Sequence, residues 1–109
     1  MKIAVSSMGN SLDSNVSEQF GRCPFFIIYE AENKQTEVIP NEAKDLPGGA
    51  GPKAVGILVN NGVDILLTGR LGNNAEEALK KSKMAVVKGF SGSVKVQDAI
   101  NDYLSGKQK

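Results

Sequence analysis

A chain of 109 residues with 40% hydrophobic and 23% charged residues has the composition of one globular domain, which we expect to span residues 1–109. Its net charge is +1 and its charges form no block, which excludes the basic face of a nucleic-acid-binding protein. The apolar runs are too short to span a membrane, and a single cysteine, unable to form an internal disulfide, favours the cytoplasm.

The first part of the chain is rich in β-forming segments. Apolar residues alternate after Met1, and a run of aromatic and β-branched residues follows Pro24. A connection of hairpin length follows that run, so its two flanking strands should be antiparallel neighbours. Pro40 should end the last of them, since proline cannot donate to a sheet. The predicted strands cover residues 2–7, 25–30 and 36–39.

The second part of the chain alternates helices with strands. Pro52 suits the first position of a helix and Gly62 its left-handed stop, so a helix is predicted from Pro52 to about Asn61. Its buried stripe should consist of Val55, Leu58 and Val59. A fourth strand is predicted at residues 64–68, whose run I-L-L is apolar on both faces, as in a strand that is covered on both sides.

Two more helices are predicted from their caps. Asn73, with Glu76 three residues later, has the spacing of a capping box at the start of the second helix. Residues 84–88 form the fifth strand. Ser93 is expected to cap the last helix, and Gly106 to stop it.

The element order is therefore β-β-β-α-β-α-β-α. Alternating strands and helices require right-handed crossovers and a parallel sheet, while the early hairpin adds antiparallel strands. We expect a mixed five-stranded sheet between helices, which is a three-layer α/β/α fold.

A binding site is expected at one edge of this sheet. Ligands of open α/β sheets bind beyond the carboxyl ends of the parallel strands, and three glycine-bearing loops should meet there: residues 6–9, 48–51 and 68–72. Glycines permit close backbone approach, and helix starts offer free N–H groups to an anion. With Arg70 nearby, the edge suits a bulky anionic ligand; the alternative, that these glycines serve only turns and caps, stays open.

The sequence offers no catalytic constellation. It contains no histidine, so no Ser-His or Cys-His pair is possible. The single cysteine, Cys23, lies between Arg22 and Pro24, and a thiol beside a cation suits metal or redox chemistry. It is equally well read as a small buried hydrophobe at a strand start.

Residues 16–30, V-S-E-Q-F-G-R-C-P-F-F-I-I-Y-E, resemble the signature of the dinitrogenase iron–molybdenum cofactor biosynthesis family, which includes NifX, NafY and the C-terminal domain of NifB. The opening M-K-I-A-V-S-S, the G-G-A-G-P-K segment and N-N-G-V-D-I-L-L-T-G-R-L-G-N-N-A extend the resemblance over nearly the whole chain. The resemblance implies a ribonuclease H-like fold. It also implies a non-catalytic carrier of iron–sulfur or iron–molybdenum cluster precursors, with metallocluster donor or acceptor proteins as partners.

The chain departs from the family pattern at two positions. Gln19 and Pro47 stand where the family commonly has histidines, so histidine ligation of a cluster cannot be carried over. Cys23 is left as the candidate metal anchor, although a stable iron–sulfur cluster usually has four protein ligands. The residues expected to line the cofactor site are Ser7, Gln19, Arg22, Gly49, Gly51, Arg70 and Asn73.

Two other functions remain open from the sequence. The same glycine-rich edge suits a small anion or a nucleotide-like ligand without metal. Alternatively, the chain is a regulatory or scaffold protein of iron–sulfur metabolism that contacts a partner without holding metal.

Overall fold

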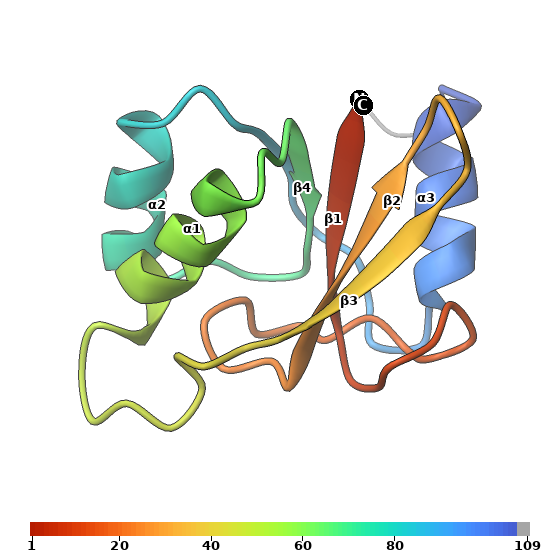
Figure 1. The fold of residues 1–109 in the computed structure, drawn as a ribbon. Coiled ribbons are helices and arrows are strands. Elements are labelled where there is room, and N and C mark those ends of the chain that lie inside the picture. Colours follow the sequence, from red (N-terminus) through yellow and green to blue (C-terminus); the bar gives the residue numbers. More distant parts are fainter. Residues whose placement is uncertain (107–109) are drawn as a thin grey trace.

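The structure, a computed structural model, describes residues 1–106 as one mixed sheet and three helices (Figure 1). The elements are β1 (Lys2–Ser7), β2 (Phe25–Glu30), β3 (Thr36–Pro40), α1 (Ala50–Asn60), β4 (Ile65–Leu67), α2 (Asn73–Lys80), β5 (Ala85–Val87) and α3 (Val96–Leu104). The predicted order of strands and helices is confirmed.

The sheet has the order β3-β2-β1-β4-β5. β2 pairs antiparallel with both β1 and β3, whereas β4 is parallel to β1 and to β5. α1 and α2 cover one face and α3 covers the other, which gives the expected three layers of a ribonuclease H-like fold (Figure 1).

Alternation along the strands divides the buried side chains into two cores. Ala4 of β1, Phe26 of β2 and Leu66 of β4 face α1 and α2. The intervening residues, such as Val5 and Leu67, pack with α3. The central strand β1 is therefore buried on both sides, and its end lies between both helix layers.

The helix boundaries differ in detail from the prediction. α1 begins at Ala50, so Pro52 is its third residue; its missing N–H is tolerated because first-turn N–H groups have no intrahelical partner. The stop at Gly62 is confirmed by its left-handed φ of 72°. Val59 was wrongly placed in the buried stripe and is 48% exposed, because it lies on the solvent side of α1.

Both predicted side-chain caps are wrong. Gly72, not Asn73, is the N-cap of α2, and no side chain caps that helix. Lys95, not Ser93, is the N-cap of α3, and the Ser93 hydroxyl pairs with Ser91 at 2.9 Å. Backbone geometry, not side-chain capping, starts these helices.

The loops that follow β1 and β4 lie backbone against backbone. A Cβ on Gly69 would lie 2.6 Å from Glu18 Cα and 2.9 Å from the Phe90 carbonyl oxygen. Arg70 N also donates to Glu18 O, and Gly89 N donates to Gly69 O at 2.9 Å. Any side chain at position 69 would push the three segments apart.

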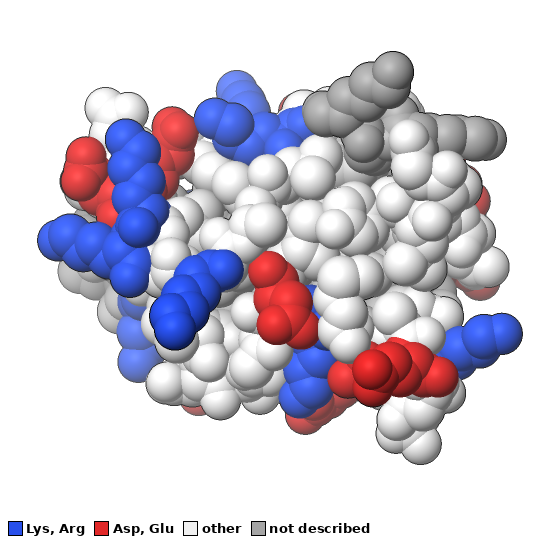
Figure 2. Space-filling view, turned by 90° about the horizontal axis from the view of Figure 1, so that it is seen from above, with Lys and Arg blue, Asp and Glu red and all other residues white. Residues whose placement is uncertain are grey.

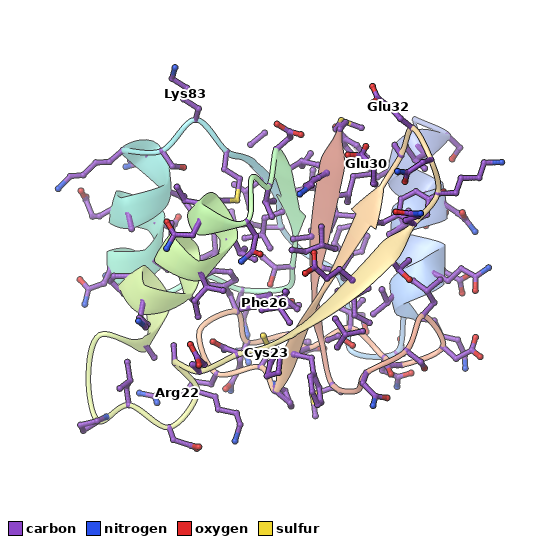
Figure 3. The ribbon with its side chains drawn as sticks, viewed as in Figure 1. Arg22, Cys23, Phe26, Glu30, Glu32 and Lys83 are labelled. Carbon is purple, nitrogen blue, oxygen red and sulfur yellow. The ribbon has the colours of Figure 1, made fainter. Side chains whose placement is uncertain are left out.

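The opposite end of the molecule carries the β2–β3 hairpin and Lys83 (Figure 3). Figure 2 looks down on that end and shows both signs of charge around a mainly uncharged centre. No helix in residues 1–106 is long and apolar enough to cross a membrane.

Replacing Gly69 with alanine is expected to lower the free energy of unfolding by about 1–3 kcal/mol, because the methyl group overlaps fixed backbone atoms. Gly56→Ala is the matched control. Gly56 lies inside α1 with open space around it, so alanine there should stabilise by about 0.5–1 kcal/mol. Urea unfolding measures both, and equal effects of the two substitutions would contradict the close approach at Gly69.

Candidate functional site

A cavity of about 630 Å³ lies where the segment before β2 meets the starts of α1 and α2. Gly21 permits this meeting, since a Cβ there would lie 3.1 Å from Gly51 Cα. Gly51 is equally constrained, because its Cβ would lie 2.9 Å from that of Ala75. The lining residues are Gln19–Arg22, Gly49–Pro52 and Arg70–Ala75. We call this space the first cavity.

Two helix N-termini open on the first cavity. Gly49, with a left-handed φ of 75°, precedes α1, and Gly72 precedes α2; neither helix has a side-chain cap. The N–H groups of a first helical turn have no intrahelical partner and form the positive end of the helix dipole. They are therefore available to an anion.

The chain's two arginines, Arg22 and Arg70, also line the first cavity. Arg22 Nη1 donates to the carbonyl oxygens of Lys44 and Leu46, at 2.9 and 2.7 Å, which ties it to the loop before α1. The side chain of Arg70 makes no hydrogen bond or ion pair within residues 1–106. No carboxylate from the described part of the chain lines this cavity, so its fixed charge is positive.

A second cavity, of about 820 Å³, adjoins the first on the side of the loop after β1. The two share Gln19, Arg22 and Arg70. The second cavity is also lined by Glu18, whose Oε2 accepts a hydrogen bond from Gly92 N at 2.7 Å. It is therefore more mixed in charge than the first.

Comparison with known proteins shows to which family this fold belongs. The family model described as dinitrogenase iron-molybdenum cofactor matches residues 1–106. The chain belongs to this family.

Similar proteins match it over almost their whole length. The apo form of the orange protein from Desulfovibrio gigas has a TM-score of 0.94 and 32% identity, covering 99% of this chain and 90% of that one. A Thermotoga protein provisionally described as NifB has a TM-score of 0.85 and 39% identity, with coverage of 99% and 90%. An uncharacterized protein of Methanocaldococcus jannaschii is 29% identical over 111 residues, which cover 98% of this chain and 92% of that protein.

Six of the seven residues expected to line the family's cofactor site meet at the first cavity, namely Gln19, Arg22, Gly49, Gly51, Arg70 and Asn73. Ser7 does not. Its hydroxyl donates to the carbonyl of Gly9 at 2.7 Å, and it is fully buried. The loop after β1 contributes Met8 and Gly9 to the second cavity instead.

Cys23 lies in the core under α1, close to Phe26 in Figure 3, and is 1% exposed. It lines neither cavity. Burial raises the pKa of its thiol from 9.0 to about 12, against the lowering effect of hydrogen bonds from the Ser7 backbone and the Asn41 amide. In this conformation the thiol is protonated and out of reach of a ligand in either cavity.

The donor set of the site suits an anion better than a bare metal ion. Within residues 1–106 no three His, Cys, Asp or Glu side chains lie close enough to hold a metal ion. The backbone N–H groups of two helix starts and the guanidinium groups of Arg22 and Arg70 surround the first cavity. The sequence did not indicate Ala75 or Asn74 as lining residues, since their role comes from the start of α2 and not from their side-chain chemistry.

The Cys23 thiol of the folded protein is expected to react with a disulfide reagent about 10³-fold more slowly than that of the unfolded chain, since burial raises its pKa from 9.0 to about 12. The unfolded thiol ionises first, so the free energy of unfolding should fall as the pH rises above about 9. Timed thiol labelling and unfolding at several pH values measure both effects. Labelling at the unfolded rate would show that the thiol is open to solvent.

Proposed function

We propose that this protein binds and carries an anionic metal–sulfur cluster, an iron–molybdenum cofactor or its precursor, in the first cavity without transforming it. One observation carries the proposal: two uncapped helix starts and both arginines surround a cavity to which the described residues add no carboxylate. The cluster is cargo, received from a donor protein and passed to an acceptor, in the cytoplasm.

Electrostatics favour such a cargo. Each helix start acts as roughly half a positive charge, and each arginine adds a full one. A charge-assisted hydrogen bond contributes about 1.5–3 kcal/mol, somewhat less at an open surface such as this. Several acting together on one polyanion would hold it without any covalent bond to the chain.

Among the described residues, no Cys, Asp or Glu side chain lines the first cavity, which supports a carrier and not a permanent site. A cluster bound only through hydrogen bonds and charge must bring its own sulfide or organic ligands. Sulfide accepts N–H hydrogen bonds, and such bonds break without ligand exchange at the metal. Release to an acceptor would then require only that the acceptor supply ligands that bind the metal.

The similar proteins also support the binding of a metal cluster. The family is described by the iron–molybdenum cofactor, and the orange protein has a structure described as its apo form, which implies a second form with a bound group. The first cavity of this chain, at about 630 Å³, is within the usual range for small-molecule sites.

The alternative is a site for a metal-free anion such as a phosphate ester. The same donors would serve it, so the geometry alone does not separate the two ligands. Affinity ranked across anions of equal charge does separate them, because a cluster site should prefer the larger, sulfur-containing anion.

The test is an anaerobic titration with tetrathiomolybdate, a coloured molybdenum–sulfur dianion, beside phosphate and molybdate, followed by reconstitution with iron and sulfide. Arg70→Gln should weaken tetrathiomolybdate binding about tenfold or more, since it removes a charged donor that makes no hydrogen bond or ion pair within residues 1–106. Lys53→Gln is the charge-matched control: Lys53 lies in α1 but outside both cavities, and its loss should change affinity by less than about twofold.

Cys23→Ser tests the predicted metal anchor in the same assay. If Cys23→Ser binds tetrathiomolybdate as the unaltered protein does, the first cavity alone forms the site. If the variant folds but no longer binds, Cys23 is the metal anchor. Equal affinity for all three anions would favour the metal-free alternative. No binding of any anion would refute the proposal.

A further inference from the structure

The outer edge of β3 is an unpaired strand edge that takes no part in the first cavity. β3 is the last strand of the sheet order and, within residues 1–106, pairs with β2 alone. It has five residues, T-E-V-I-P, without a lysine or arginine. The opposite edge, β5, has three residues and is followed by Lys88, and short edges flanked by lysine resist pairing with other chains. β3 is two residues longer than β5, and its own charged residue and proline, Glu37 and Pro40, can both be accommodated in a pair with a second copy.

The hydrogen bonds at the two ends of β3 show which backbone groups face outward. Glu30 N donates to Gln35 O at 2.9 Å, and Asn41 N donates to Pro24 O at 3.0 Å. Both odd-numbered residues, 35 and 41, therefore face β2, and alternation assigns Glu37 and Ile39 to β2 as well. The N–H and C=O groups of Thr36 and Val38, with the carbonyl of Pro40, are left on the free edge. The nitrogen of Pro40 faces the unpaired side, so its missing N–H removes no hydrogen bond within the sheet.

This edge is complementary to itself. In an antiparallel pair centred on Val38, each Val38 would exchange two hydrogen bonds with its copy, and Thr36 N–H would reach the carbonyl of Pro40. The missing N–H of Pro40 falls at the end of the pair. Val38, 38% exposed, would meet its own copy on the face that carries α3.

The other face of β3 adds charge complementarity. Ile39 lies with Lys53 and Ile57 of α1 in a groove of about 360 Å³, which Glu42 also lines. The register centred on Val38 places Glu37 of one copy opposite Ile39 of the other. Glu37 would then lie at the mouth of the groove that holds the other copy's Lys53.

We propose that two copies of this chain pair through β3 into a continuous ten-stranded sheet. The strand pair is short, so the dimer is weak and depends on concentration. Its twofold axis passes between the two Val38 residues and reverses the strand direction, so the two first cavities lie at opposite ends of the dimer and both stay open. Cargo binding and pairing are therefore independent.

The test measures molar mass by light scattering, and amide hydrogen exchange, from micromolar to millimolar protein. The expected result is a mass that rises toward twice the monomer value, with Thr36 and Val38 amides more protected at high concentration. Val38→Lys should abolish the rise, because it places two lysines against each other on the axis. Val59→Lys is its control, at a valine that is 48% exposed and lies outside the interface.

A charge exchange tests the register. Glu37→Lys should weaken pairing at least several-fold, and the double variant Glu37→Lys with Lys53→Glu should restore it; Glu32→Lys, in the hairpin before β3, should change little. A monomer at every concentration would overturn the proposal. So would a dimer that survives Val38→Lys, or a β3 edge protected only when a different protein is added.

Discussion

The structure depends on one constraint, which is the meeting of backbones at Gly21, Gly51 and Ala75. A methyl group on Gly21 or Gly51 would come within about 3 Å of its neighbour, closer than packed atoms usually lie. Because these positions carry no side chain or only a methyl group, the starts of α1 and α2 lie close to the segment before β2. That segment contains Gln19 and Arg22, which line both cavities. The first cavity follows from this contact, and so does its chemistry, since a surface made of helix starts presents N–H groups.

This arrangement limits what the site can do. Backbone N–H groups held by packed helices cannot move toward a metal, and they cannot replace a ligand on it. They can accept an anion of suitable size at little cost in reorganisation, because their direction is already fixed. The side chain of Arg70 has no hydrogen-bond or ion-pair partner within residues 1–106 and is available to the anion, whereas Arg22 is held by the carbonyls of Lys44 and Leu46. Backbone donors of fixed direction, together with one cation that is not tied to the described chain, suit reversible carriage better than catalysis.

Much of the fold could be predicted from the sequence because its strands and helices are short and strongly patterned, and glycine and proline mark their ends. The six lining residues could be located because strand topology determines which loops share an edge. The errors have a common cause. Capping by Asn73 and Ser93 was inferred from side-chain chemistry, but the extended residues Gly72 and Lys95 precede those helices and no side chain caps either one. At the start of α3, Val96 N and Gln97 N donate to backbone carbonyls of the loop after β1 instead. Ser7 was placed in the site by its position after β1, yet the strand end is buried on both sides and turns its hydroxyl to Gly9.

Cys23 shows why a local sequence signal can mislead. A thiol beside Arg22 suggests a reactive thiolate, but adjacency in the sequence does not give two side chains the same surroundings, and Arg22 lies in a turn before β2. Arg22 faces the cavities and Cys23 the core, where Asn41 binds its carbonyl at 2.9 Å and burial keeps the thiol protonated. The two residues therefore have different roles. Arg22 contributes positive charge to the anion site, and the Cys23 thiol packs in the core beneath α1. A carrier gains from this division, because a thiolate in the cavity would bind the metal of its cargo and slow its release.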